Sequence, residues 1–239
     1  MKLTFLGTRG EIEKRTRRHR MHTSLMVSYR NADVMIDCGL DWLGKLRLLN
    51  PSAIVLTHAH PDHAWGLKHG APCPVYAPQK TWQELRHYPI EDRHVIEERT
   101  PAKICGIIFE AFPVEHSILS PAVGYRLSGG RARIFYVPDL IFIHERSAAL
   151  KGVQIYIGDG ATLTRSFIRR RGKALIGHSP VQTQLTWCEK AGVPRAIITH
   201  CGSEIVTGDE RKTSVIIQTM GHDRGIDAQL AYDGMKLTL

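Results

Sequence analysis

The stretch that decides how this sequence folds is Ala53-Ile54-Val55-Leu56-Thr57-His58-Ala59-His60-Pro61-Asp62-His63. Its first half is apolar and β-branched, which is typical of a buried strand. Its second half places three histidines and one aspartate within six residues, directly after that strand. Imidazole nitrogens suit zinc, manganese and iron, and a carboxylate adds a hard oxygen ligand. The stretch therefore predicts a metal centre where the strand ends, and a histidine-rich surface loop is the weaker interpretation.

The same arrangement, an apolar run followed by a residue that can bind a metal or carry a proton, recurs along the chain. The residues at the ends of these runs are Asp37, His116, Asp139, Asp159 and His200. Ligand sites in layered folds collect where strands end and loops begin. We therefore expect these side chains to gather beside the histidine-rich stretch.

Helix-like stretches separate these runs. The clearest of them, Val181–Ala191, is followed by Gly192 and Pro194, which commonly end helices. Strands that alternate with helices predict an α/β layered fold. Residues 229–238 predict two more strands, joined at an Asp-Gly turn. With 239 residues, 43% of them hydrophobic and 23% charged, the chain has the size and balance of a single globular domain over residues 1–239.

The sequence also bears on the cellular compartment. No apolar run approaches the roughly 20 residues that a membrane helix needs, and Met1–Gly7 fits a first strand better than a signal peptide. The five cysteines are scattered, odd in number and without a Cys-x-x-Cys pair, which argues against a disulfide framework. We predict free thiols, no membrane association and a cytoplasmic location.

Positive charge is concentrated in two segments of a chain whose formal net charge is +9. The first segment, Lys14–Arg20, includes Arg15, Arg17 and Arg18, and the second, Thr162–Gly177, includes Arg165, Arg169, Arg170, Arg171 and Lys173. Such segments attract polyanions, although a solvated surface is an equal interpretation. We hypothesise that the loop of residues 9–22 lies beside the metal site. Arg15, Arg17 and Arg18 would then bind the phosphates that flank a scissile bond.

The number of candidate ligands favours two metal ions over one. A single catalytic metal is satisfied by three protein ligands and a water molecule. Two metals about 3.5–4 Å apart need a bridging carboxylate with ligands on both sides. Asp139 is the natural bridge, and His116 and His200 complete the two ligand sets. Zinc is the metal we expect, with manganese and iron as alternatives that the same ligands suit.

With these residues in place, the sequence resembles the metallo-β-lactamase superfamily. Within it, the sequence is similar to the phosphodiesterase branch that holds tRNase Z and the cyclic phosphodiesterase of phosphonate breakdown. The likeness runs from Leu6-Gly7-Thr8 through Asp37-Cys38-Gly39 to Tyr232-Asp233-Gly234-Met235. It implies a four-layer αβ/βα sandwich and a homodimer. It also implies two ligand groups, His58, His60 and His116 for one metal and Asp62, His63 and His200 for the other, with Asp139 between them.

The resemblance further implies roles in catalysis. Lactamases of this fold use a cysteine where Asp139 stands, which disfavours antibiotic hydrolysis. In tRNase Z-like proteins a histidine in the position of His178 protonates the leaving alkoxide, a task that an imidazole can perform near neutral pH. A helix-capping or core histidine is the alternative. We expect His178 and the ligand Asp62 to take part in catalysis.

Two aspartates are expected to support the metal ligands without binding metal themselves. The resemblance implies that Asp37 hydrogen-bonds a ligating histidine, and a turn or cap role is an equal alternative. Asp159, which ends its own strand, is assigned to the same outer layer of the site.

The sequence also departs from these relatives. The spans from His116 to Asp139 and from Asp139 to His178 leave no room for the protruding arm with which bacterial tRNase Z grips tRNA. The cysteine-rich zinc insert of the phosphonate-pathway enzyme is missing as well, since no cysteine precedes Cys38.

The function we predict is a dinuclear metal-dependent phosphodiesterase or nuclease. A metal-bridging hydroxide would attack a phosphodiester of RNA, DNA or a cyclic nucleotide. One alternative is a thioester or lactone hydrolase of the same fold, although glyoxalase II-like enzymes add a helical domain that this chain lacks. The other is a nucleic-acid-binding protein with a degenerate metal site.

Overall fold

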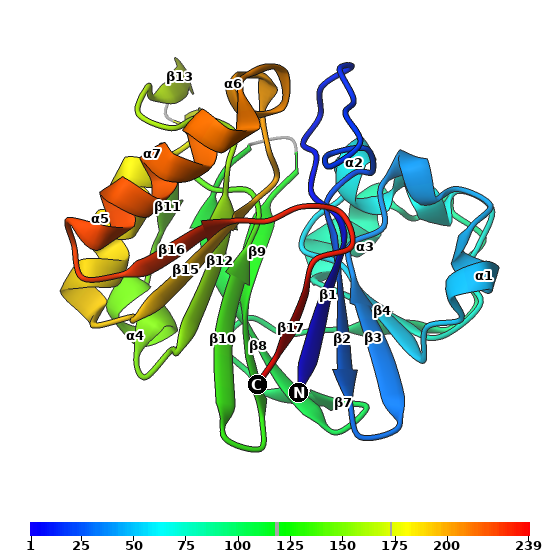
Figure 1. Ribbon diagram of the computed structural model, residues 1–239. Coiled ribbons are helices and arrows are strands. Elements are labelled where there is room, and N and C mark those ends of the chain that lie inside the picture. Colours follow the sequence, from blue (N-terminus) through cyan, green and yellow to red (C-terminus); the bar gives the residue numbers. More distant parts are fainter. Residues whose placement is uncertain (118–119, 173) are drawn as a thin grey trace.

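The computed structural model describes residues 1–117, 120–172 and 174–239. Two mixed β-sheets face each other, and helices cover the outer side of each (Figure 1). The layers therefore run helix, sheet, sheet, helix, as the predicted four-layer αβ/βα sandwich requires. In the part of the chain that is described, no helix is both long and apolar enough to span a membrane.

The first sheet contains the N-terminal strands and the last strand of the chain, in the order β17-β1-β2-β3-β4-β5-β6. Its strands are β1 (Lys2–Gly7), β2 (Ser24–Tyr29), β3 (Ala32–Ile36), β4 (Ala53–Val55), β5 (Val75–Ala77), β6 (Arg93–Val95) and β17 (Lys236–Thr238). From β3 to β6 the neighbouring strands are parallel, whereas β17 pairs antiparallel with β1. The two ends of the chain therefore lie side by side (Figure 1).

The second sheet has the order β11-β8-β9-β10-β12-β15-β16, and β7 also pairs with β8. Its strands are β7 (Ala102–Ile104), β8 (Ile107–Glu115), β9 (Ala122–Gly129), β10 (Ala132–Val137), β11 (Phe142–Ile143), β12 (Ile155–Asp159), β15 (Arg195–Thr199) and β16 (Asp227–Leu230). The strands β10, β12, β15 and β16 run parallel to one another. Helices cover this sheet, so β12 is buried along its whole length, which explains the apolar run Ile155-Tyr156-Ile157 before Asp159.

The helices beside the first sheet are short. They are α1 (Leu46–Leu49), α2 (Pro61–Ala64) and α3 (Gln79–Glu84), with the 3₁₀ turns η1 (Leu40–Trp42) and η2 (Trp65–Leu67). Those beside the second sheet are α4 (Arg146–Leu150), α5 (Val181–Ala191), α6 (Ser203–Thr207) and α7 (Glu210–His222). The helix predicted at Val181–Ala191 is confirmed as α5, and Gly192 ends it in the left-handed conformation at φ +67°.

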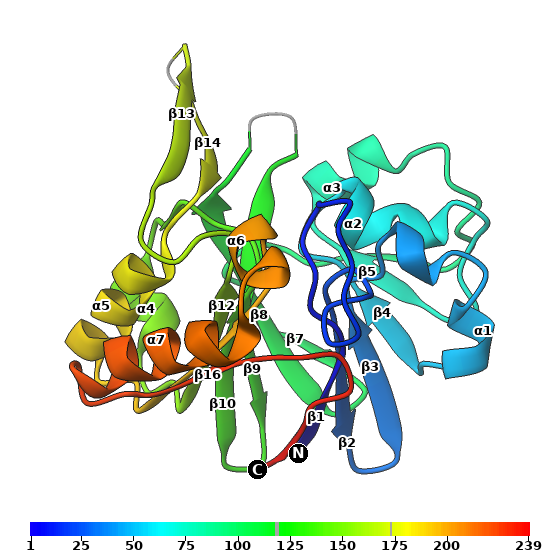
Figure 2. The same ribbon diagram turned by 45° about the horizontal axis from the view of Figure 1, so that its top comes forward.

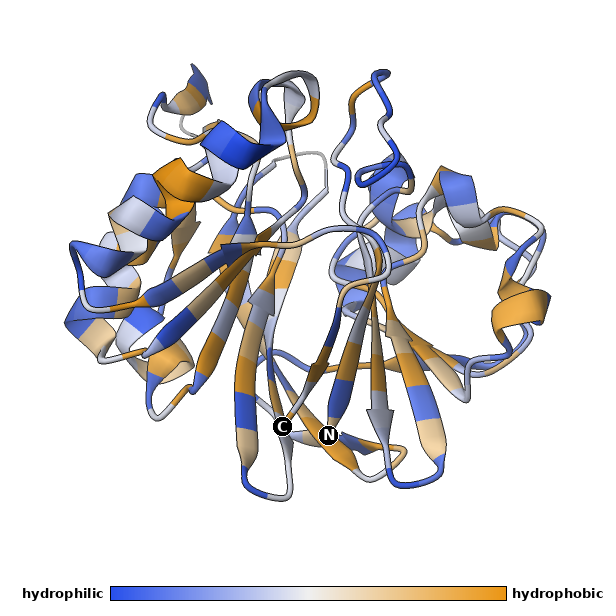
Figure 3. Cartoon of the chain, in the orientation of Figure 1, coloured by the Kyte–Doolittle hydropathy of each residue, from blue (hydrophilic) through white to orange (hydrophobic). Residues whose placement is uncertain are grey.

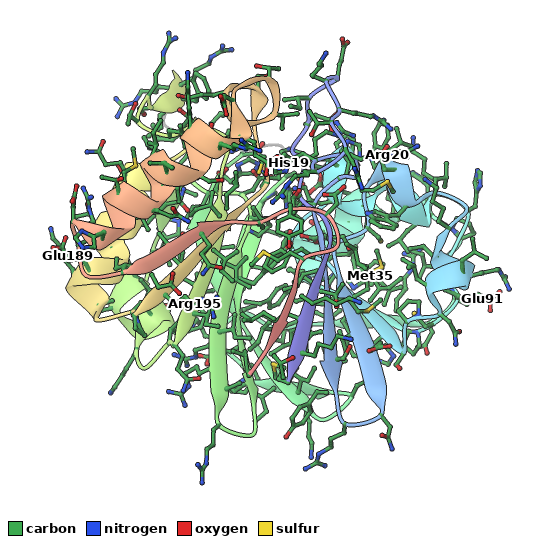
Figure 4. All side chains as sticks on the ribbon, in the orientation of Figure 1. His19, Arg20, Met35, Glu91, Glu189 and Arg195 are labelled. Atoms are coloured by element: carbon green, nitrogen blue, oxygen red, sulfur yellow. The ribbon has the colours of Figure 1, made fainter. Side chains whose placement is uncertain are left out.

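Apolar side chains form one core between the sheets and one beneath each helical layer. Figure 3 shows the hydrophobic residues on the strands and the hydrophilic ones on the outer helical surfaces and strand ends. Figure 4 shows that side chains fill the space between the sheets. Phe5, Tyr125 and Tyr136 are among the largest side chains in this central core.

The second basic segment forms a hairpin that projects beyond the second sheet (Figure 2). Its strands are β13 (Phe167–Arg171) and β14 (Ala174–His178), which pair antiparallel. The span before His178, where we expect no tRNA-gripping arm, thus does hold a short projecting hairpin. Consecutive arginines obscured the strand in the sequence. Lys173, which we grouped with these cations, lies outside the described residues.

The C-terminal strands also differ from the prediction. The Asp-Gly turn does not join a paired hairpin, because β16 pairs with β15 and β17 pairs with β1 in the other sheet. Asp233 instead accepts hydrogen bonds from Thr8 Oγ1 (2.7 Å) and from the backbone N–H groups of Arg20 (2.8 Å) and Met21 (2.9 Å). The turn thus connects the two sheets and fixes the N-terminal loop.

Candidate metal centre

The histidine-rich stretch lies where β4 gives way to α2. His58 and His60 occupy the connecting loop, and Pro61 takes the first position of α2, where its missing N–H costs no helical hydrogen bond. Asp62 and His63 then share the first turn of this helix and are buried. The short loop and the helical turn direct both pairs of side chains to the same edge of the sheets.

The other predicted ligands reach this edge from the second sheet. His116 directly follows β8, Asp139 follows β10 by two residues and His200 directly follows β15. The expectation that the polar residues at strand ends lie close together is therefore confirmed. His200 itself has φ +52°, a conformation that few residues other than glycine adopt.

Two groups of side chains could each hold a metal ion. The first is His58, His60, His116 and Asp139, and the second is Asp62, His63, Asp139 and His200. Within each group the candidate ligand atoms lie within 4.8 Å of one another. Asp139 belongs to both, and its Oδ2 lies 3.4 Å from His58 Nε2 and 3.0 Å from His63 Nε2. This is the position that a bridging carboxylate needs.

The chemistry of these groups fits cations. Among the described residues, His63 Nε2, Asp139 Oδ1 and His200 Nδ1 are buried and form no well-aligned hydrogen bond. His63 Nε2 lies 3.0 Å from Asp139 Oδ2, and His200 Nδ1 lies 3.2 Å from Asp139 Oδ1. Buried polar atoms are normally paired, because leaving them unpaired costs free energy. Nitrogen and carboxylate oxygen are the donors that zinc, manganese and iron accept, so two divalent ions would satisfy all three atoms.

Burial and local charge set the protonation of the first group. Burial, reinforced by His63 and His60, holds the pKa of His58 well below its usual value, and burial and the neighbouring His116 lower that of His60 to about 4. Burial also lowers the pKa of His116. Neutral imidazoles are the form that binds metal.

Negative charge dominates the second group. Burial opposes the ionisation of Asp62 and Asp139, but their histidine neighbours hold both pKa values well below the usual range. Burial likewise opposes the charged form of His200, yet Asp139 above all raises its pKa to about 9. Burial opposes the charged form of His63 as well, but Asp62 and Asp37 hold its pKa well above the usual value. Metal binding to this group would therefore release protons from His63 and His200.

Asp37 lies behind this second group. It follows β3 and has φ +60°. His63 Nδ1 lies 2.9 Å from Asp37 Oδ2, and Thr57 donates to Asp37 from its N–H (2.8 Å) and its hydroxyl (2.9 Å). Thr57 Oγ1 in turn lies 3.0 Å from His58 Nδ1. Asp37 and Thr57 therefore fix the rings of one histidine from each group, with Nε2 of each toward Asp139.

His178 ends β14 beside the metal groups. Its Nδ1 lies 2.8 Å from Asp159 Oδ2 and 3.1 Å from Asp139 Oδ1. Burial disfavours its charged form, but the charges of Asp159 and Asp139 raise the pKa of His178 to about 11. Asp159 is itself fixed by the N–H of Ala161 (2.8 Å). The imidazolium thus lies against two carboxylates, and a third possible ligand group also includes it.

A cavity of about 520 Å³ opens over these residues. The sequence did not single out several of the residues in its wall, namely Gly10, Glu11, Ile12, Phe167, Ile176 and Glu204. Partial burial and the charge of Asp62 raise the pKa of Glu11. Glu11 and Ile12 lie just before the arginine-rich segment Lys14–Arg20. That segment is the one signal in the sequence that points to their loop.

The arginines assigned to phosphate binding do not line this cavity. Arg15 pairs with Asp41 (2.8 Å), and Arg18 pairs with Glu210 and stacks on the ring of Tyr232. Arg17 is exposed. The predicted phosphate contact therefore lacks support for Arg15 and Arg18, because both are paired with carboxylates away from the cavity.

A buried arginine holds the N-terminal loop instead. Arg9 is 1% exposed and pairs with Asp41 (2.5 Å), and its Nε donates to the carbonyl of Arg20 (3.2 Å). Asp41 also accepts from the N–H of His22 (2.9 Å). These contacts close the loop at its base and place Gly10 beside the cavity, where an added Cβ would lie 3.0 Å from the ring of His200.

Most of the chain matches a known protein family. Residues 32–201 match the family described as the beta-lactamase superfamily domain. A ribonuclease Z of Methanococcus maripaludis is 29% identical over 153 residues, which cover 52% of this chain and 48% of the relative. The matched region thus spans about half the length of that relative.

Solved structures resemble the whole chain. A diphosphatase from the PhnP family has a TM-score of 0.73 and 22% identity, and covers 100% of this chain and 97% of its own. The short form of human tRNase Z has a TM-score of 0.67 and 18% identity, with coverages of 100% and 99%. At these identities the two likenesses show the fold alone.

Proposed function

The chain belongs to the beta-lactamase superfamily, and we propose that within it the chain is a metal-dependent phosphodiesterase. The observation that carries this proposal is the position of Asp139 between two groups of ligands, with buried histidine nitrogens facing it that form no well-aligned hydrogen bond. Two divalent ions, zinc in the first place, would be held by His58, His60 and His116 and by Asp62, His63 and His200, with Asp139 between them. When bound, such ions supply Lewis-acid activation of water and of the phosphoryl group.

The chain's own residues supply the other requirements of phosphodiester cleavage. Asp37 and Thr57 hold the ligand rings of His63 and His58, so the site needs little rearrangement to take up metal. An alkoxide is a poor leaving group and needs a proton, and we assign its donation to His178. Asp159 fixes the tautomer and the direction of that ring through Nδ1, which leaves Nε2 for the leaving oxygen.

Asp139 favours phosphodiesters over lactams, because lactamases of this fold have a cysteine there. A carboxylate at the bridge suits hard cations and anionic phosphoryl substrates. The name of the ribonuclease Z relative supports a nucleic acid as the polymer that contains the phosphodiester. We keep a thioester or lactone substrate as the alternative outcome of the test below.

The remaining assignments are also proposals. Pairing of β17 with β1 supports one domain over residues 1–239, because the last strand completes the first sheet. Five free cysteines support a reducing compartment such as the cytoplasm. A homodimer remains a prediction from the resemblance.

The test uses bis-p-nitrophenyl phosphate as the substrate and a metal-reconstituted protein. We expect hydrolysis by the wild type and at least a 100-fold lower kcat/KM for His60→Ala. His69→Ala provides the matched control, since His69 is exposed and lies outside both ligand groups. Equal activity of His60→Ala and the wild type would contradict the proposal. Turnover of thioesters but not phosphodiesters would favour the alternative substrate.

A further inference from the structure

We propose that one face of the β13–β14 hairpin binds the nucleotide that adjoins the scissile phosphodiester, so that the substrate is a single-stranded oligonucleotide rather than a cyclic nucleotide. This inference rests on the proposed phosphodiesterase function. Its evidence is the position of Phe167 and Ile176 in the cavity wall and of Arg169 on the same face of the hairpin.

The strand register places these residues on the same face. Phe167 pairs with His178, and Arg169 pairs with Ile176. Partners in an antiparallel pair project to the same side of the sheet, and so do residues two apart along a strand. Phe167, Ile176 and His178 all line the cavity. Arg169 therefore extends the cavity face outward from Phe167 by two residues, or about 6.8 Å.

Phe167 provides a surface on which a base can stack. It lines the cavity and remains 47% exposed, with the guanidinium of Arg165 5.8 Å from the centre of its ring. Ile12 contributes a second apolar group to the cavity from the N-terminal loop. Aromatic side chains beside a basic surface are how proteins bind single strands without reading sequence.

Arg169 provides a charge that no carboxylate among the described residues neutralises. It is exposed, and within residues 1–117, 120–172 and 174–239 it forms no ion pair. Arg15 and Arg18, in contrast, are already paired with Asp41 and Glu210. A free guanidinium just outside the metal site is suited to a phosphate one nucleotide away from the scissile one.

The hairpin is also fixed relative to the site. Gly177 donates its N–H to the carbonyl of His116 (3.1 Å), and His116 Nδ1 lies 3.1 Å from the carbonyl of Gly177. At Gly177 the φ is +132°, and a Cβ would come within 1.7 Å of the carbonyl oxygen of Phe167. Only glycine allows β13 to approach so closely, so the stacking residue and the metal ligand are held on one short piece of backbone.

The same hairpin offers a matched control. Arg170 pairs with Leu175 and lies on the opposite face from Arg169. The two arginines carry the same charge, and both are exposed. If the hairpin acts only through its net charge, replacement of either arginine has the same effect. If one face binds the substrate, only Arg169 matters.

The experiment compares Phe167→Ala, Arg169→Ala and Arg170→Ala on a short single-stranded oligoribonucleotide and on bis-p-nitrophenyl phosphate. For Phe167→Ala and Arg169→Ala we expect the ratio of kcat/KM between oligonucleotide and small substrate to fall about tenfold. The loss should arise mainly in KM. Arg169→Ala should also reduce the slope of log(kcat/KM) against log salt concentration by about one. Arg170→Ala should keep both activities within about twofold of the wild type.

Binding of the fluorescently labelled oligonucleotide, followed by anisotropy, supplies a readout that does not need turnover. The dissociation constant should rise about tenfold for Arg169→Ala and stay near the wild-type value for Arg170→Ala. Equal effects of the two arginines, or wild-type turnover of a cyclic nucleotide but not of the oligonucleotide, would overturn the inference. If the wild type hydrolyses no phosphodiester, the proposed function fails, while the anisotropy comparison still decides the role of the hairpin face.

Discussion

Replacement of Asp37 with asparagine tests how the metal site is held together. Asparagine has the same shape and also tolerates the left-handed backbone that Asp37 adopts at φ +60°, so the turn itself should survive. What changes is one acceptor atom. With its remaining oxygen on the N–H of Thr57, the new amide group would face His63 Nδ1, which lies 2.9 Å from the carboxylate in the wild type.

The size of the effect follows from that contact. An N–H donor opposite Nδ1 forces His63 to carry its proton on Nε2, the atom that faces Asp139 and the metal position. Metal binding at Nε2 must then move the proton back to Nδ1. The Nδ1–H group would there face the N–H of the new amide, so two donors would oppose each other without an acceptor. A hydrogen bond to a charged group contributes about 1.5–3 kcal/mol, so the affinity should fall roughly 10- to 100-fold.

The assay is a competition titration with a chromophoric chelator, which resolves tight and weak metal sites. We expect one site to weaken by this factor and the other, which contains His58, His60 and His116, to change less. Asp33→Asn is the control, because Asp33 lies exposed on the same strand. Wild-type affinity at both sites in Asp37→Asn would refute the assigned role of Asp37.

Three further predictions concern catalysis, the hairpin and acid stability. His178→Asn should lower kcat by about 10²- to 10⁴-fold on an alkyl phosphodiester but far less on bis-p-nitrophenyl phosphate, whose leaving group needs no proton; equal losses on both would exclude proton donation. Gly177→Ala should accelerate amide hydrogen exchange in β13 and β14 without affecting the sheet cores, because the added Cβ meets the carbonyl of Phe167; unchanged protection would show that the backbone adapts. His19, labelled in Figure 4, is 2% exposed, and burial, with a smaller effect of Arg18, lowers its pKa to about 4. As the pH falls, the unfolded chain binds this proton before the folded chain does. The free energy of unfolding should therefore fall between about pH 6.5 and pH 4, by up to about 1.4 kcal/mol per pH unit. Urea unfolding of His19→Gln should show a weaker dependence of this free energy on pH, and an equally steep dependence would locate the acid sensitivity elsewhere.

The metal centre was predictable because its residues carry the signal themselves. His58, His60, Asp62 and His63 are adjacent in sequence, and His116, Asp139 and His200 each end an apolar run. Parallel strands bring such ends to one edge, so the cluster follows from the strand assignment. The helix Val181–Ala191 followed from its glycine stop in the same way.

Tertiary contacts decided what the sequence left open. Phe167 and Ile176 acquire meaning only once the hairpin register puts them on one face with His178. The arginines of the N-terminal loop looked free for phosphate, but the partners of Arg15 and Arg18 are 26 and 192 residues away in the chain, at Asp41 and Glu210. Strand pairing likewise separated β16 from β17, although an Asp-Gly turn lies between them.

Anomalous diffraction at the metal absorption edge, from crystals of the protein purified with its metal, tests the central claim most directly. We predict two peaks about 3.5–4 Å apart on either side of Asp139, one beside His58, His60 and His116 and the other beside Asp62, His63 and His200. A single peak away from Asp139, or no peak in a protein that still hydrolyses bis-p-nitrophenyl phosphate, would contradict the two-metal account.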